Sequence, residues 1–165
     1  MSVAGAGEPR SGEAKPELSL DLPAAHSAAR MARHLVRQFA KSGGLPEAEL
    51  DTLVLVADEL LTNAVDHGGG KGSLEEADLE RPVRMRMQLG LDPLGWELRV
   101  SDQGGGDPAL VDRLLHPDDL PDLEDERGRG FFLMAQMVDS LEVRRSADGL
   151  GLELIAIRRL GSDHG

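Results

Sequence analysis

Hydrophobic and polar residues follow two different spacings along this chain, and the spacings predict where it forms strands and helices. Alternation of apolar and polar positions predicts strands at 18–22, 83–89 and 96–100. The same alternation predicts a further hairpin, formed by residues 141–145 and 150–159. These segments are short and half apolar, which is typical of strands with one face in a core.

Apolar residues spaced three and four apart predict the helices. One helix begins near Pro23, which suits a first helical turn, and ends at the glycine pair at 43–44. A second runs from Pro46 to Asp66, and shorter helices are predicted at 107–115 and 131–140. The apolar stripe of the second helix consists of Leu50, Leu53, Val54, Ala57, Leu60, Leu61 and Ala64.

The order of these elements predicts the fold class. Turn chemistry at Asp92–Gly95 and at Asp148–Gly149 joins neighbouring strands into hairpins, and the regular alternation of strand and helix that builds parallel sheets is absent. We therefore expect an α+β fold, a two-layer α/β sandwich with a mostly antiparallel, mixed sheet and its helices on one face.

Length and composition set the domain organisation. The 165 residues suffice for one domain, expected at 18–160, with a disordered tail at 1–17 and a short tail at 161–165. No run of about 18 apolar residues occurs, and the first residues lack the basic start and apolar core of a secretion signal, so we expect no membrane association. The lack of cysteine fits a reducing compartment, and the cytoplasm is the expected location.

The charge balance excludes one class of partner. The chain has a net charge of −12 and only 2% aromatic residues, so it lacks both the basic surface and the stacking platforms of a protein that binds nucleic acid directly. An acidic chain can still bind an anionic nucleotide where a divalent cation and backbone N–H groups offset the repulsion.

Glu59 and Asn63 form the first candidate for chemistry. They are four residues apart in the second predicted helix, so they share a face and flank its apolar stripe. An amide oxygen can bind Mg²⁺ together with nucleotide phosphates, and a carboxylate one turn away could accept a proton. The alternative is that both are ordinary solvated residues at a helix edge.

Asp102 is the second candidate. It continues the inward-facing set of its strand and is followed by Gly104 and Gly106, which leave room for a flat base or a phosphate. A carboxylate on the inner side of a sheet needs a partner, and an adenine amino group would serve. The alternative is a strand-ending turn with Asp in a favoured position.

The third candidate is the segment Arg127, Gly128, Arg129 and Gly130, just before a predicted helix. Free N–H groups at a helix start attract phosphate, and glycines allow it to approach. An ordinary loop-to-helix junction would have the same composition.

Other common sites are not indicated by the sequence. The P-loop and dinucleotide-binding motifs fail on spacing. The five histidines show no metal-ligand pattern, so His67 is expected to end a helix.

Together these segments resemble one known family. ADELLTNAVDHG (57–68) resembles the N box of the GHKL, or Bergerat-fold, ATPases in the form typical of anti-sigma-factor serine/threonine kinases. VSDQGGG (100–106) is similar to their D-x-G-x-G box, and RGRGFFLM (127–134) to their G-x-G box. The likeness spans roughly residues 18–160, with the three boxes in the family's order.

The resemblance implies a role for each site residue. By position, Glu59 corresponds to the general base, Asn63 to the Mg²⁺ ligand and Asp102 to the adenine-binding aspartate. Gly104 and Gly106 correspond to residues of the base pocket, and Arg127, Gly128, Arg129 and Gly130 to the segment at the triphosphate. The implied cofactors are ATP and Mg²⁺. The implied partners are a sigma factor, an anti-sigma-factor antagonist that is phosphorylated, and a second copy of the chain.

Two segments differ from the family pattern. The expected ATP lid contains a dense acidic run, DDLPDLEDE at 118–126, and the loop at 68–81 is long and rich in glycine. Two functions therefore stay open: a protein kinase that also sequesters a partner, and a module that sequesters a partner without catalysis. The catalytic domain of a sensor histidine kinase is disfavoured because no phosphoacceptor helix or membrane segment precedes the boxes.

Overall fold

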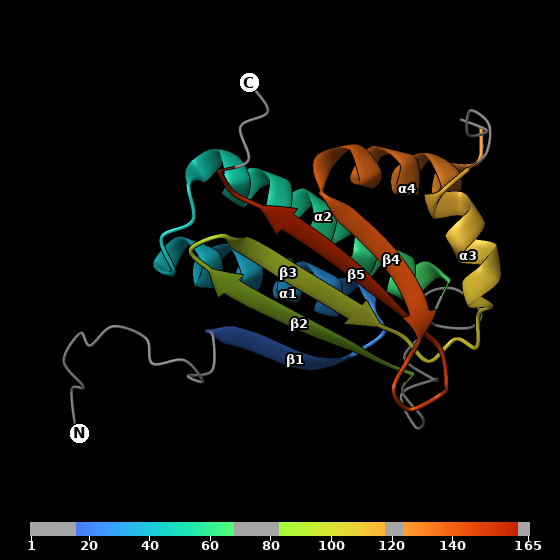
Figure 1. Ribbon diagram of the computed structural model, residues 1–165. Coiled ribbons are helices and arrows are strands. Elements are labelled where there is room, and N and C mark those ends of the chain that lie inside the picture. Colours follow the sequence, from blue (N-terminus) through green and yellow to red (C-terminus); the bar gives the residue numbers. More distant parts are fainter. Residues whose placement is uncertain (1–15, 68–82, 118–123, 162–165) are drawn as a thin grey trace.

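In the computed structural model, which describes residues 16–67, 83–117 and 124–161, helices and strands follow the order expected from the sequence (Figure 1). The expected tails, the loop at 68–81 and most of the acidic run at 118–126 lie outside the described residues. The elements are β1 Glu17–Pro23, α1 His26–Ser42, α2 Glu47–Asp66, β2 Arg84–Asp92, β3 Gly95–Ser101, α3 Pro108–Leu115, α4 Glu126–Met137, β4 Ser140–Arg145 and β5 Leu152–Arg159.

The described strands form a five-stranded sheet in the order β1-β2-β3-β5-β4, and each neighbouring pair is antiparallel. The β2–β3 hairpin turns where expected, and Asp92 Oδ1 accepts a hydrogen bond from the Leu94 N–H at 2.7 Å. Glycine is required at position 95, since φ is +152° and a Cβ would lie 1.9 Å from the Arg158 carbonyl oxygen. The antiparallel prediction is confirmed, and the parallel pairing that a mixed sheet requires is not found among these strands.

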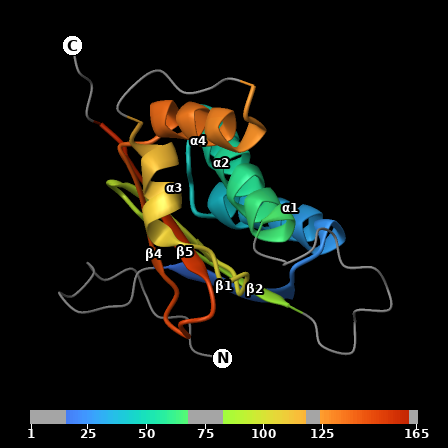
Figure 2. The ribbon, with the colours of Figure 1, turned by 90° about the vertical axis from the view of Figure 1, so that its right-hand side faces the viewer.

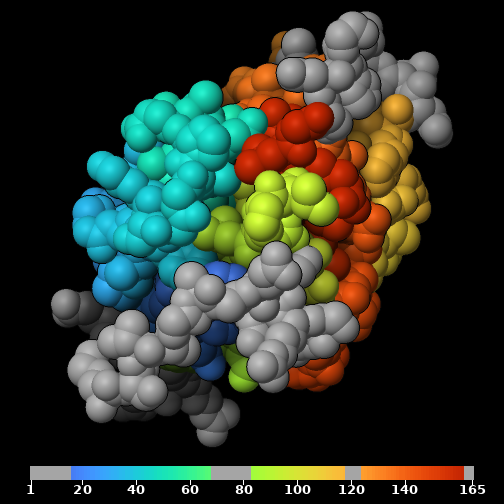
Figure 3. Space-filling view, turned by 60° about the vertical axis from the view of Figure 1, so that its left-hand side comes forward, coloured from blue at the N-terminus to red at the C-terminus, as the bar shows by residue number. Residues whose placement is uncertain are grey.

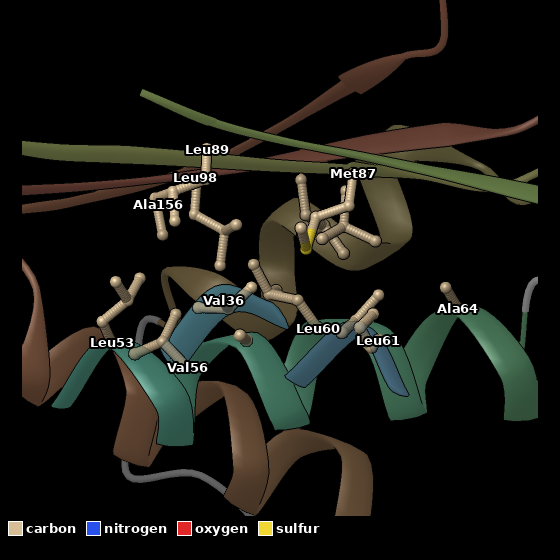
Figure 4. Close-up of a cluster of buried hydrophobic side chains, with 14 of the residues drawn as sticks. Val36, Leu53, Val56, Leu60, Leu61, Ala64, Met87, Leu89, Leu98 and Ala156 are labelled. Carbon is tan, nitrogen blue, oxygen red and sulfur yellow. The ribbon is translucent and has the colours of Figure 1, made fainter. Parts of the chain in front are cut away.

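Helices α1, α2 and α4 cover the same face of the sheet, which gives the predicted two-layer sandwich (Figures 1 and 2). Between the layers, Leu60 and Leu61 of α2 and Val36 of α1 point toward Met87 and Leu98 of the sheet (Figure 4). All five are buried, and burial of each such side chain contributes about 1.5–3 kcal/mol. This core fixes α2 against the sheet and so positions the residues at the helix end.

The bounds of α2 agree with the prediction, since Pro46 precedes its first residue and His67 follows its last. The predicted stripe is buried apart from Val54, which is half-buried. Asn63, however, is only 7% exposed and lies within the buried face, whereas the sequence pattern places it beside the stripe. The buried face is wider at this end because α4 also packs against α2 there.

Pro23 lies at the end of β1 and not in the first turn of α1, so that prediction is wrong. It pairs with Arg84 across the edge of the sheet. Because β1 has a neighbour on one side only, the missing proline N–H costs little in the hydrogen-bonded ladder. Helix α1 begins only at His26.

Helix α4 departs furthest from the prediction. The sequence pattern places it at 131–140, but it spans Glu126–Met137. Its early start follows from Asp125, whose carboxylate accepts a hydrogen bond from the Arg127 N–H at 3.1 Å and caps the helix. Residues 127–130 therefore form the first turns of α4 and do not form a loop in front of it.

Candidate functional site

Asp102 directly follows β3 and is 6% exposed, as its inward position in the alternating pattern predicts. Its Oδ1 accepts hydrogen bonds from the Gly104 N–H at 2.9 Å and the Leu152 N–H at 3.3 Å. Burial raises the pKa of the Asp102 carboxyl, and these two backbone hydrogen bonds partly offset the effect. Oδ2 accepts no hydrogen bond from a described residue, so the site holds one fixed acceptor that is free for a ligand.

Glycines allow the backbone to close around this carboxylate. A Cβ added to Gly106 would lie 2.9 Å from Leu152 Cδ1. The tightest approach is at Gly151, in the facing β4–β5 connection, where a Cβ would lie 2.3 Å from the Asp102 carbonyl oxygen and 2.4 Å from its Oδ1. Gly151 thus sets the position of Asp102. Its place two residues after the Asp148–Gly149 turn was the available sequence signal, but only the sheet pairing shows what it faces.

Glu59 lies where α2 approaches the first turns of α4. A Cβ added to Gly130 would lie 2.8 Å from Glu59 Oε2, so the carboxylate rests against α4. The residue as a whole is exposed, yet partial burial of the carboxyl and the charge of Asp58 raise the pKa of Glu59, while Arg129 opposes the shift. A carboxylate with a raised pKa is a stronger proton acceptor.

Asn63 is joined to α4 through Arg127. Arg127 Nε donates a hydrogen bond to Asn63 Oδ1 at 3.0 Å, and its guanidinium carbon lies 5.5 Å from the centroid of the Phe131 ring. Asn63 Nδ2 is buried and has no partner among the described residues. Such an unpaired donor costs about 1–3 kcal/mol, so this amide is incompletely satisfied in the folded chain.

The predicted phosphate segment lies within the first turns of α4, whereas the sequence places it in front of a helix. Gly128 is buried within the helix, and a Cβ there would lie 3.4 Å from Asp125 Oδ2. Arg129 is exposed, and its positive charge acts to lower the pKa of Glu59. Because Asp125 already accepts the Arg127 N–H, one of the donors that a phosphate could use is bound to a carboxylate of the chain itself.

The predicted residues thus meet in two groups that Arg127 connects. Asp102 with Gly104 and Gly106 forms the first group, and Glu59, Asn63, Arg127, Gly128, Arg129 and Gly130 form the second, where α2 meets α4. Burial lowers the pKa of Arg127 and the charge of Asp102 opposes the shift, so this guanidinium, which is bonded to Asn63 of the second group, also lies within the field of the first.

The donor atoms of the second group fit a hydrated Mg²⁺ ion that is held mainly by a nucleotide. Asn63 Oδ1 is an oxygen ligand of the type Mg²⁺ takes, and the unpaired Nδ2 beside it is a donor for a ligand oxygen. Over residues 16–67, 83–117 and 124–161, no cluster of three or more His, Asp or Glu side chains could hold a metal by itself. His67 caps the C-terminus of α2, as expected.

Comparison with known proteins places this geometry in context. The family "Histidine kinase-like ATPase domain" matches residues 22–156. A chain of the SiaB–SiaC complex from Pseudomonas aeruginosa is similar in structure, with a TM-score of 0.63 and 15% identity over 85% of this chain and 88% of that one. The RsbU and RsbW domains of Rv1364c from Mycobacterium tuberculosis give a TM-score of 0.57 and 19% identity, over 87% of this chain and 32% of that one.

At these identities the solved structures show a shared fold. This chain spans about a third of the Mycobacterium tuberculosis protein, so it corresponds to one part of it. No curated protein matches the sequence. None of the helices described is long and apolar enough to cross a membrane.

Proposed function

Because the chain belongs to the histidine kinase-like ATPase domain family, we propose that it binds Mg-ATP and phosphorylates a serine or threonine of an anti-sigma-factor antagonist. The observation that carries the nucleotide part is the Asp102 carboxylate. It is buried, two backbone N–H groups fix its Oδ1, and its Oδ2 is free to accept the amino group of adenine. Such a charge-assisted hydrogen bond favours adenine over guanine, which has a carbonyl oxygen at that position.

The second group of residues would hold the triphosphate. Asn63 supplies an oxygen ligand for Mg²⁺ and an unpaired amide donor, while Arg127 and Arg129 supply positive charge in an otherwise acidic chain. When bound, Mg²⁺ would neutralise charge on the phosphate oxygens. Gly128 and Gly130 carry no side chain, and at Gly130 this leaves room for the Glu59 carboxylate beside the first turns of α4, where Arg127 and Arg129 would meet the phosphates.

Glu59 is the proposed general base. Its carboxylate would accept the proton of the partner's hydroxyl as the oxygen–phosphorus bond forms and the bond between the γ-phosphorus and the bridging oxygen breaks, releasing ADP. Its raised pKa suits this step, and its position against Gly130 directs it toward the start of α4.

The partners belong to the same proposal. The proposed kinase is part of a regulatory switch. In the unphosphorylated branch of that switch, we expect a dimer of this chain to bind a sigma factor in the cytoplasm, where ATP is available. The SiaB–SiaC structure contains a complex of two different proteins, and the other neighbour carries an RsbW domain beside an RsbU domain. Both neighbours support the proposal that this domain acts by binding other proteins.

Transfer of labelled γ-phosphate tests the proposal. Partners captured from host lysate are identified by mass, purified, and incubated with the parent protein or with Glu59→Ala. We expect Glu59→Ala to bind ATP and partner like the parent but to transfer phosphate about 10²–10⁴-fold more slowly, because a positioned base has been removed.

Glu47→Ala removes an exposed carboxylate from the first turn of the same helix; it is the matched control and should retain transfer. A parent protein that binds a partner tightly and never labels it would exclude the kinase. The non-catalytic sequestering module would then be the function of this domain.

A further inference from the structure

Arg127, at the start of α4, makes separate contacts through its backbone and through its side chain. Its backbone N–H is bound by Asp125, while its side chain reaches back across the helix pair to Asn63 on α2. The side chain is half-buried and its guanidinium lies over the Phe131 ring, which restricts the conformations that the Arg127 side chain can adopt. The contact therefore holds a full positive charge beside the amide that the proposed function assigns to Mg²⁺.

The atom that accepts this hydrogen bond is the one the metal would use. Arg127 Nε donates to Asn63 Oδ1 at 3.0 Å, and Oδ1 accepts no other hydrogen bond from the described residues. A divalent cation bound to the same oxygen would lie within a few ångströms of the guanidinium. Two cations at that distance repel each other strongly in a partly desolvated site.

Without a nucleotide, the guanidinium still has partners within the fold. Burial lowers the pKa of Arg127, and the negative charges of Asp102 and Asp125 partly offset this effect. The guanidinium also satisfies one half of a buried amide whose other half, Nδ2, is unpaired. Removal of the guanidinium would leave both polar atoms of Asn63 without a partner.

We propose that Arg127 is a resident cation of the nucleotide-free site, which holds Asn63 Oδ1 until Mg²⁺ replaces it. This rests on the proposed function, since it assumes that the site binds Mg-ATP. Arg127 must leave Asn63 when the metal enters, and it can partly substitute for the metal when ATP binds alone. The residue thus sets how strongly nucleotide binding depends on Mg²⁺.

The test is the dissociation constant of ATP, measured by calorimetry once in EDTA and once in saturating Mg²⁺. The quantity compared is the ratio of the value in EDTA to the value in Mg²⁺. In Arg127→Met we expect the ratio to rise by about tenfold, the effect of losing one charge-assisted hydrogen bond. Binding in EDTA weakens because the cation is gone, while binding with Mg²⁺ is unchanged or tighter because the competitor is gone. Arg127→Lys keeps the charge and should restore most of the parent ratio.

Arg30→Met, an equal change of charge on the exposed side of α1, is the control and should leave the ratio unchanged. If Arg127→Met weakens ATP equally in both conditions, Arg127 is an ordinary phosphate or structural contact, and the inference is overturned while the proposed function stands. If the parent binds no ATP in either condition, the proposed function fails and takes the inference with it.

Thermal unfolding without nucleotide gives a second readout. Arg127→Met should lower the unfolding temperature by about 2–4 °C, the shift expected for loss of one such contact in a domain of this size. In an Asn63→Leu background the same change should have little effect, because its acceptor is already absent. An equal shift in both backgrounds would contradict the Arg127–Asn63 contact.

Discussion

The two ends of α2 each bind an arginine from a distant element, and the two contacts differ in completeness. At the first turn, Glu49 forms a bidentate pair with Arg158 of β5, with distances of 3.0 and 3.1 Å. This pairing raises the pKa of Arg158. At the last turn, Arg127 gives one hydrogen bond to a neutral amide oxygen of Asn63, whose Nδ2 is left unpaired. In the first contact both carboxylate oxygens of Glu49 are hydrogen-bonded within the fold, whereas in the second one polar atom of the Asn63 amide has no partner among the described residues.

The end of the molecule that carries the Glu49–Arg158 pair is built from the α1–α2 connection, the β2–β3 turn and the end of β5 (Figure 3). It also has one unpaired buried donor, the indole Nε1 of Trp96. An unpaired atom alone therefore does not mark a site. The other end is distinguished because three incompletely matched polar groups, those of Asn63, Arg127 and Asp102, gather there.

The largest effect is expected from Asn63→Leu. Leucine has a similar volume and removes the unpaired donor, so the nucleotide-free protein should keep its stability within about 1 kcal/mol. Binding of Mg-ATP should weaken by about 10²-fold, the upper range for loss of a group that supports a bound metal. Calorimetry with Mg-ATP and urea unfolding measure the two effects. Full nucleotide affinity in this variant would show that Asn63 is only a core residue.

Glu49→Ala should have the opposite outcome at the other end of α2. It removes one partner of a partly buried, bidentate ion pair and should cost about 1–2 kcal/mol of unfolding free energy. Mg-ATP affinity should stay unchanged, because the pair lies at the far end of the helix. Urea unfolding of this variant beside Asn63→Leu compares the ends directly. A loss of nucleotide affinity larger than the loss of stability would contradict the division into a structural end and a functional end.

The smallest structural change with a functional effect is expected from Gly130→Ala. Its Cβ would meet Glu59 Oε2 at 2.8 Å, and the flexible carboxylate can move away, so stability should change by less than about 1 kcal/mol. The displaced Glu59 should transfer phosphate about 10-fold more slowly, a part of the effect of deleting the base. Gly90→Ala, where an added Cβ has open space, is the control. Unchanged transfer in Gly130→Ala would remove the link between this glycine and Glu59.

Much of the fold could be predicted from the sequence because local patterns determine it. The alternation in β2 and β3 and the turn at Asp92–Gly95 define a hairpin within a single segment, and the stripe of α2 defines its buried face. The inward position of Asp102 followed from the same alternation. Each of these features depends on residues that are near one another in the chain.

The features that the sequence did not reveal depend on contacts between distant segments. Asn63 is buried because α4 covers that side of α2, and Gly151 matters because the pairing of β3 with β5 brings it directly against Asp102. The start of α4 was misplaced because glycines normally disfavour helix, whereas the Asp125 cap and the packing of Gly130 against Glu59 outweigh that preference here. Of these contacts only the Asp125 cap is local, and the glycines that follow it mask the helix start; the others join segments that are distant in the chain.

The most direct test of the nucleotide site is calorimetry of ATP binding to the parent protein and to Asp102→Asn, with and without Mg²⁺. The parent should bind ATP in a Mg²⁺-dependent manner. Asp102→Asn should bind more weakly by about 1.5–3 kcal/mol, because a charge-assisted hydrogen bond to adenine is lost while the amide oxygen can still accept the Gly104 and Leu152 N–H groups. Equal affinity of the two proteins, or no binding by the parent, would contradict the assignment of Asp102 to the binding of ATP.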